Sequence, residues 1–240
     1  MTDANVTPPR MVVAIDGPAA SGKSSTARWV AERLGYRHVD SGALYRAVTL
    51  LALREAGAPE AWQEAAVRAL ADRVTLAPSQ AGFEPLLDGE RASDAIRSPD
   101  VTRLVSKTAQ MASVRSWVNE RVRAAGQAHD VVVDGRDIGS VVFPDAPLKV
   151  FLVADPWERA RRRLIQRLGR HPADDEIAVE TEQLVGRDAK DATQTVQARD
   201  AVLIDTTYLT QTEQVDRIVA LARACARSLA AGRAEAPDAP

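Results

Sequence analysis

The segment that most constrains this chain lies near its start and fits the pattern G-x-x-x-x-G-K-[ST] at every fixed position. Its residues are Gly17, Pro18, Ala19, Ala20, Ser21, Gly22, Lys23 and Ser24. Glycines at this spacing allow a tight turn whose backbone N–H groups converge on phosphate oxygens at a helix N-terminus. The lysine of this pattern reaches the β- and γ-phosphates, and the final hydroxyl binds Mg²⁺. We therefore predict an ATP or GTP site on this loop and on Ser25, which follows it.

The residues around the loop provide the strand and the helix that the pattern requires. The apolar run 11–16 is rich in β-branched residues and ends at Gly-Pro, as a buried strand does. A helix is predicted from about 22 to 34, with Ala27, Val30 and Leu34 on one face. The loop thus joins a buried strand to a helix, which is the setting in which it binds phosphate.

Further buried strands alternate with helices along the chain. Strands are predicted over 130–135, 148–154 and 201–205, and helices over 42–56, from 98, from 156, over 173–193 and from 210. In the last helix, the side chains expected to face inward are Val215, Ile218, Ala222, Cys225 and Leu229. This alternation indicates an α/β fold with a parallel sheet covered by helices on both faces.

The region 58–97 has a different texture and is predicted to be an insertion into the sheet domain. After a short helix that begins at Pro59, its runs are short and alternating, and they are broken by turn residues such as Pro78, Gly82 and Pro85. That pattern favours a small β-hairpin. The core domain is then 11–57 and 98–229. The polar ends, 1–10 and 230–240, are predicted to be a disordered lead-in and a loose tail.

Composition excludes several classes of protein. Of 240 residues, 45% are hydrophobic and 27% charged, as in average globular proteins. A formal net charge of −2 gives no global field that attracts nucleic acid or an anionic membrane. No apolar run approaches the ~18 residues of a membrane span, and the start lacks the apolar region of a secretory signal. The single cysteine suits a reducing compartment. We expect a soluble, cytoplasmic monomer that binds neither nucleic acid nor membrane.

Charged residues beyond the loop indicate where phosphate chemistry takes place. Asp134 ends a predicted buried strand, where a carboxylate can help to hold the water shell of Mg²⁺. Arg136 and Asp137 follow at the carboxyl edge of that strand, where ligands bind in open α/β sheets. Six arginines crowd one predicted helix and its end: Arg159, Arg161, Arg162, Arg163, Arg167 and Arg170. We expect some of them to neutralise phosphates during transfer and the others to be solvated surface charges.

Several longer segments resemble bacterial cytidylate kinases, which are nucleoside monophosphate kinases. They span about 12–221 and are IDGPAASGKSS, VDSGALYRA, LLDGE, VSKTAQMASVR, VVDGRDIGSVVFPDAPLKVFLVA, RDAKD and DAVLIDTT. The resemblance implies a three-layer P-loop NTPase fold with a five-stranded parallel sheet. It also implies an inserted domain, with a small β-sheet, that binds the nucleoside monophosphate, and a short lid over about 156–175. The implied reaction is phosphoryl transfer from ATP, with Mg²⁺, to CMP or dCMP.

The resemblance also implies roles for individual residues. Those expected to contact the acceptor are Ser41, Arg46, Ser106, Arg115, Arg136, Asp137, Arg187 and Asp191. Arg46 and Arg136 would bind the CMP phosphate, and Arg187 with Asp191 would contact the ribose. Ser106, Arg115 and Asp137 would recognise cytosine, because a carboxylate accepts from its amino group and a site of buried polar groups rejects a mismatched base.

One segment departs from the family pattern. The family usually has an arginine three residues after the position of Asp191, followed by a loop that contains Pro-Leu. In this chain that position is Gln194, and the connection to Asp200 is shorter by a few residues. Because glutamine carries no charge, either Arg199 or a lid arginine compensates for it, or the affinity for the acceptor is reduced.

The expected mechanism is direct transfer without a covalent intermediate. A phosphate oxygen of CMP attacks the γ-phosphorus in line, and Mg²⁺ held through Ser24 helps to stabilise the transferred group. The catalytic cations would be Lys23, Arg136, Arg159, Arg162 and Arg163. Closure of the insertion and the lid would exclude water.

Two other functions remain open from the sequence. A UMP/CMP kinase with a broader range of acceptors is hard to exclude, because uracil differs from cytosine only at one exocyclic group and at N3. A P-loop switch would bind and slowly hydrolyse a nucleotide without an acceptor, and it would have no need of the cytosine-reading residues. The same residues disfavour AMP and shikimate as acceptors.

Overall fold

Runs of apolar, β-branched residues form the strands at the centre of the molecule. β1 (Val12–Asp16) and β6 (Val131–Asp134) are buried along their whole length, as strands are when helices cover both faces of a sheet. The structure is a computed structural model and describes residues 10–234. The predicted disorder of 1–9 and 235–240 lies outside the described residues.

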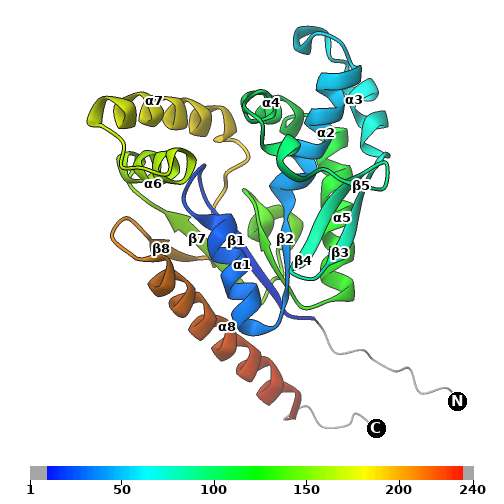
Figure 1. Cartoon of the computed structure of the whole chain (residues 1–240). Coiled ribbons are helices and arrows are strands. Elements are labelled where there is room, and N and C mark those ends of the chain that lie inside the picture. Colours follow the sequence, from blue (N-terminus) through cyan, green and yellow to red (C-terminus); the bar gives the residue numbers. More distant parts are fainter. Residues whose placement is uncertain (1–9, 235–240) are drawn as a thin grey trace, which may run out of the picture.

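Five parallel strands form the core of the sheet, in the order β2-β6-β1-β7-β8 (Figure 1). Besides β1 and β6, they are β2 (Arg37–Asp40), β7 (Leu148–Val153) and β8 (Val202–Asp205). β1 lies in the middle, between β6 and β7, and carries the phosphate loop at its C-terminal end. A loop at this position opens into the crevice where α/β sheets bind their ligands.

The whole sheet has eight strands, not the expected five, because the insertion extends it. The three added strands are β3 (Val74–Ser79), β4 (Gly82–Leu87) and β5 (Glu90–Arg91), and β4 pairs antiparallel with both of the others. β4 joins β2 by pairing Gly82 with His38. Gly82 has φ +145°, and a Cβ there would lie 2.3 Å from the His38 carbonyl oxygen, so only glycine allows this approach. The predicted hairpin therefore continues the core sheet.

Helices cover both faces of the sheet, as predicted. On one face, α1 (Lys23–Leu34) and α8 (Gln211–Ala234) pack Val30 and Ile218 against Val13 and Ile15. On the other face, α2 (Ser41–Glu55) and α5 (Ala112–Ala128) pack Leu44 and Trp117 into a second core. Burial of these large side chains is the main force that holds the three layers together.

Two groups of helices rise above the sheet on opposite sides of the phosphate loop (Figure 1). One is the pair α6 (Pro156–Leu168) and α7 (Asp174–Asp191), which share a small core of Leu164, Ile177 and Leu184. Asp155 caps α6 and accepts from Trp157 N at 2.9 Å. The other group contains α2 with α3 (Glu64–Ala71) and α4 (Pro99–Ala109). Short 3-10 turns cover Pro59–Ala61 and Ser93–Arg97, and a π-turn covers Ile138–Val142.

The structure differs from the predicted elements at three places. β2 was not predicted, since Val39 is its only fully buried residue and four residues give little periodicity. α8 continues to Ala234, so 230–234 of the predicted tail are helical, as their alanine content favours. Leu229, predicted to face inward, is 37% exposed because α8 runs past the end of the sheet (Figure 1). Within residues 10–234, no helix combines the length and the apolar character needed to cross a membrane.

Candidate functional site: a phosphate loop between two cavities

The phosphate loop has the backbone geometry of an anion site. Gly17 has φ +146°, and a Cβ there would lie 2.2 Å from the Leu152 carbonyl oxygen on β7. Ala20 and Gly22 also have positive φ, at 57° and 86°. Among the described residues, no side chain caps the start of α1. Its first N–H groups are therefore directed into the cleft, where they can bind phosphate oxygens.

The loop is held from the side by α6 and α7. Ala19 N donates to Asp188 at 2.9 Å, and Arg159 donates to the Ala19 carbonyl at 2.8 Å and to Asp188 at 2.6 Å. Arg159 is buried and lines neither of the two cavities described below. The arginine predicted to act on phosphate from the lid thus braces the loop in this structure. Asp188 was not singled out from the sequence.

Lys23 lies at the first turn of α1 and folds back over the loop. Its Nζ donates to the Pro18 carbonyl at 2.5 Å and to Ser21 Oγ at 3.4 Å. Burial, followed by the charge of Arg136, lowers the pKa of Lys23 to about 7. The negative charge of a phosphate would offset both effects and favour the charged ammonium.

Ser24 belongs to a chain of three polar side chains. Its hydroxyl donates to Asp134 Oδ2 at 2.5 Å, and Asp134 Oδ1 lies 2.7 Å from His38 Nε2. Although burial opposes its charge, hydrogen bonds from His38 and Ser24 hold the pKa of Asp134 below its ordinary value. His38 was not singled out from the sequence, where it shows no spacing to another metal-binding or catalytic residue.

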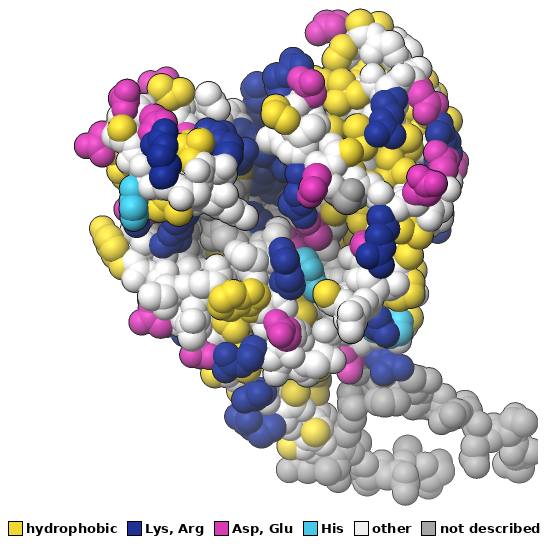
Figure 2. All heavy atoms as spheres, in the orientation of Figure 1, with side chains coloured by type: hydrophobic (Ala, Val, Ile, Leu, Met, Phe, Trp, Pro, Cys, Tyr) yellow, Lys and Arg dark blue, Asp and Glu magenta, His cyan; other side chains and the backbone are white. Residues whose placement is uncertain are grey.

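Two cavities open beside the loop, in the hollow between the two groups of helices (Figure 2). The larger has a volume of about 1130 Å³ and is lined by residues 20–25 of the loop. The smaller has about 190 Å³ and lies over the ends of β2 and β6. Lysine and arginine side chains gather around this hollow (Figure 2).

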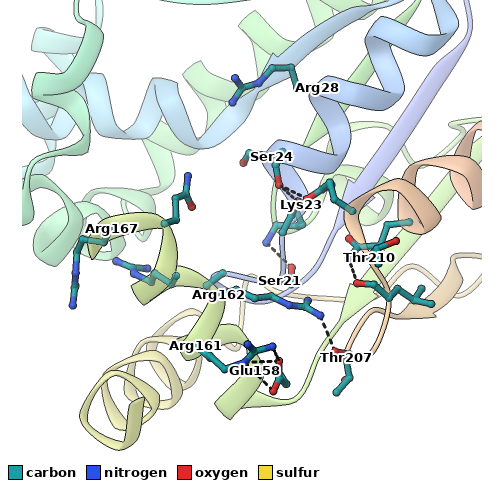
Figure 3. A pocket seen from close by; sticks show the side chains of 18 of the residues that line it. Ser21, Lys23, Ser24, Arg28, Glu158, Arg161, Arg162, Arg167, Thr207 and Thr210 are labelled. Carbon is teal, nitrogen blue, oxygen red and sulfur yellow. Dashed lines mark hydrogen bonds and ion pairs between the residues drawn. The ribbon is translucent and has the colours of Figure 1, made fainter. Parts of the chain in front are cut away.

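The larger cavity is walled by the phosphate loop, α6 and the segment before α8. Arg162 points towards this segment and donates to the carbonyl oxygens of Thr206 and Thr207 at 2.6 and 2.7 Å (Figure 3). Arg161 instead pairs with Glu158 on its own helix at 2.7 Å. Helix α6 is therefore joined to the segment before α8. Tyr208, at the same wall, is 92% exposed.

All eight residues predicted to contact the acceptor line the smaller cavity: Ser41, Arg46, Ser106, Arg115, Arg136, Asp137, Arg187 and Asp191. They come from α2, α4, α5, the turn after β6 and the end of α7. Arg115 pairs with Asp137, and Arg136 pairs with Asp191 at 2.7 Å. Burial raises the pKa of Asp137, although Arg115 opposes this shift.

The turn that carries Arg136 and Asp137 is fixed from below by Asp16. This carboxylate accepts from the backbone N–H groups of Ile138 and Gly139, both at 2.8 Å. Burial raises the pKa of Asp16 to about 6, against the effect of these two hydrogen bonds. The end of β1 thus supports both the phosphate loop and the polar wall of the smaller cavity.

The two cavities meet at a cluster of cations. Residues that line both are Ala20, Lys23, Ser24, Arg46, Arg97 and Arg163. Burial, followed by the charge of Arg187, lowers the pKa of Arg46 to about 10. Arg97, which comes from the insertion and was not singled out from the sequence, pairs with Asp40 at 3.0 Å. Arg163 pairs with Glu180 at 3.0 Å. Such a concentration of positive charge suits a triphosphate that faces a second phosphate.

The segment that departs from the family pattern reaches the smaller cavity through Gln194. Arg199, one of the two predicted substitutes for the missing arginine, lines neither cavity. Arg163, a lid arginine, lines both, and so does Arg97. Arg163 on α6 and Arg97 therefore lie at the meeting point together with Lys23 and Arg46.

The oxygen ligands beside the loop fit a magnesium ion. Mg²⁺ prefers carboxylate, hydroxyl and phosphate oxygens, and it is usually bound with substrate phosphates rather than in an all-protein cage. The Ser24 hydroxyl and the Asp134 carboxylate provide such oxygens at the start of α1. Within residues 10–234, no three His, Cys, Asp or Glu side chains group as a metal centre of their own. The donor set thus suits an ion that arrives with the nucleotide.

A phosphate loop on the central strand, a pair of helices beside it and a second, polar cavity are the features of a P-loop kinase. The cytidylate kinase family model matches residues 13–224. The cytidylate kinase of Chlorobaculum tepidum is 44% identical over 214 residues, 86% of this chain and 90% of that one. That of Chloroherpeton thalassium is 40% identical over 222 residues, covering 89% and 93%, and that of Limosilactobacillus fermentum is 43% identical over 211 residues, covering 86% and 92%. The chain belongs to the cytidylate kinase family.

Proposed function

We propose that this protein transfers the γ-phosphoryl group of ATP to CMP or dCMP, giving ADP and CDP or dCDP. The main support for the proposal is that the two cavities meet at four cationic side chains: Lys23, Arg46, Arg97 and Arg163. The larger cavity has room for a nucleoside triphosphate over the phosphate loop, and the smaller has the polar lining of a base and a sugar. The names of the relatives agree with this assignment.

In this mechanism the chain positions two phosphates and neutralises their charge. Lys23 contacts the β- and γ-phosphates, while Arg46 and Arg136 orient the acceptor phosphate for in-line attack. Mg²⁺, held by the Ser24 hydroxyl and the donor phosphates with Asp134 beside it, neutralises phosphate charge when bound. Arg162 and Arg163 act from the lid, and Arg159 acts by holding Ala19 in place.

Recognition of the base depends on the pair formed by Arg115 and Asp137. The carboxylate accepts from the cytosine amino group, and Arg115 with Ser106 donates to N3 and O2. UMP presents a carbonyl oxygen at the position of the amino group, so it would leave the Asp137 carboxylate without a donor. Arg187 and Asp191 are assigned to the ribose.

The proposal also assigns a role to each part of the chain. The insertion 58–97 supplies Arg97, and 156–175 acts as the lid. The other acceptor contacts come from α2, α4, α5, the turn after β6 and the end of α7. Both cavities are built by a single chain, which supports a monomeric enzyme. The nucleotide substrates and the lone cysteine support a cytoplasmic location.

The test is ADP formation from Mg-ATP with CMP, dCMP, UMP, AMP or shikimate as acceptor, with Lys23→Ala as the blank. We expect turnover to be highest with CMP and dCMP and to be lost in the blank. A profile led by UMP would keep the kinase but remove the cytosine assignment. ADP formation that does not depend on an acceptor would overturn the proposal in favour of a nucleotide switch.

A further inference from the structure

His38 is a buried titratable residue in contact with the site, and the proposed mechanism gives it no role. Its imidazole is 12% exposed and lies 2.7 Å from an Asp134 carboxylate that is 5% exposed. We propose that His38 is a positioning residue that fixes the Asp134 carboxylate, and through it the Ser24 hydroxyl, for the Mg²⁺-bound donor phosphates. This inference rests on the proposed function, because it assigns His38 to the donor half of that reaction.

Strand register brings His38 to Asp134. In the parallel pair β2–β6, His38 is opposite Val132 and Asp40 is opposite Asp134. Because side chains alternate between the faces of a strand, Val132 and Asp134 share one face with His38. A long side chain can reach its diagonal neighbour in such a pair. This face is the one covered by α1, whose first turn carries Ser24.

The backbone of His38 is held on both sides. It pairs with Val132 on β6 and with Gly82 on β4. The contact with Gly82 is close enough that any Cβ at that position would collide with the His38 backbone. A side chain on a strand that is paired at both edges is placed more accurately than one on a loop. The insertion thereby helps to define where the imidazole lies.

The hydrogen bonds leave the Asp134 carboxylate little freedom. Oδ1 accepts from the His38 imidazole and Oδ2 accepts from the Ser24 hydroxyl, so the plane of the carboxylate is fixed at both oxygens. The Asp134 main-chain carbonyl accepts from Ser41 at 2.8 Å, on the acceptor side. Without His38, the carboxylate would keep its bond to Ser24 but could rotate about its last side-chain bond. Outer partners that orient a carboxylate beside a metal typically contribute 10- to 100-fold to metal affinity or activity.

The experiment compares His38→Leu with His38→Gln, because the Gln amide nitrogen can donate from nearly the place of Nε2 and Leu cannot. Calorimetry measures ADP binding with Mg²⁺ and with EDTA, and the ratio of the two affinities gives the contribution of the ion. We expect His38→Leu to reduce this ratio about ten-fold and to lower kcat, with the KM for CMP little changed. His38→Gln should restore most of both. His129→Leu, a histidine packed against Phe83 and outside both cavities, serves as the matched control.

The inference is overturned if folded His38→Leu keeps the full contribution of Mg²⁺, or if His38→Gln loses as much of it as His38→Leu. Should His38→Leu fail to fold, the comparison of His38→Gln with the shorter His38→Asn carries the same test, with the loss expected only in the shorter amide. ADP binding does not require an acceptor. An enzyme that fails to phosphorylate CMP would thus contradict the proposed function without deciding the role of His38.

Discussion

Lys23 is the residue whose protonation should respond most to the nucleotide. With a pKa of about 7, it is largely neutral at pH 8 in the unliganded protein. A triphosphate favours the charged form, so the pKa rises towards the ordinary value of ~10.4 and a proton is taken up on binding. Calorimetric titration of Mg-ATP at pH 8 in buffers of different ionisation enthalpy should show this uptake, and Lys23→Met should abolish it. Equal buffer dependence in both proteins would contradict the prediction.

The protonation of Asp137 should determine the pH below which CMP binds less well. Its pKa is raised by burial, so it becomes protonated at a higher pH than an ordinary aspartate, and a neutral carboxyl group binds the cytosine amino group less well. We expect kcat/KM for CMP to fall as the pH drops through this raised range, with a smaller change for ATP. Asp137→Ala should lower kcat/KM for CMP about 10- to 100-fold, because Arg115 is left unpaired. If kcat/KM for CMP in Asp137→Ala still fell over the same pH range, the fall would belong to another titrating group.

At the scale of elements, the junction of β4 with β2 should depend on Gly82. Gly82→Ala combines a left-handed φ with a Cβ 2.3 Å from a carbonyl oxygen, so we expect a loss of about 2 kcal/mol or more in the free energy of unfolding. Gly57→Ala is the matched control, since Gly57 has φ +73° but no atom within 4 Å of its Cβ position. Urea unfolding of both variants measures the difference. Equal losses would mean that the close approach to His38 contributes nothing.

The bracing of the phosphate loop by α6 and α7 should depend on Arg159. Replacing it with Met leaves Asp188, whose side chain is 22% exposed, without its 2.6 Å partner, so we expect a loss of about 1–3 kcal/mol. Arg161→Met removes a pair on the same helix whose arginine is 40% exposed, and it should cost about 0.5 kcal/mol or less. Chemical unfolding of the two variants checks both values. A loss in Arg159→Met no larger than in Arg161→Met would show that the brace is dispensable.

At the scale of the whole molecule, the cations where the cavities meet repel one another until phosphates arrive. We therefore expect the lid and the acceptor side to approach each other when both substrates are bound. Fluorescent labels at exposed Asp94 and Asp175, in a Cys225→Ala background, should show higher energy transfer with CMP plus a non-hydrolysable ATP analogue. Labels at Asp94 and Glu120, both on the acceptor side, should show no change. Unchanged energy transfer between the labels at Asp94 and Asp175 would show that the two sides do not approach each other.

The parts of the site that could be predicted are those formed by residues that are adjacent in the sequence. The phosphate loop follows from eight adjacent positions, and the acceptor residues follow from strings that resemble a family, so all eight line one cavity. His38 could not be predicted, because its contact with Asp134 depends on the register of two strands 96 residues apart. Arg159 was grouped with Arg162 and Arg163 by their shared helix. Its burial depends on Asp188, which lies 29 residues further on.

The prediction of the fold was likewise accurate for local features and inaccurate for non-local ones. The alternation of strands and helices predicted the layers, since it depends on local hydrophobic pattern. The number of strands could not be predicted, because the hairpin joins the core through a single pair at Gly82. The end of α8 was also misjudged, since a small-residue segment suits a helix as well as a tail.

The brace between Ala19 and Asp188 spans 169 residues and has a consequence for the making of the protein. During synthesis the phosphate loop leaves the ribosome well before the carboxylate that holds it, because the two lie 169 residues apart. β1 likewise lacks β6 until residue 134 has been made, and it lacks β7 until residue 153. Non-local pairing of this kind forms late and slowly. The nascent phosphate loop therefore lacks its neighbouring strands and its brace until residue 188 has been made, so it cannot hold a nucleotide in the native geometry before then.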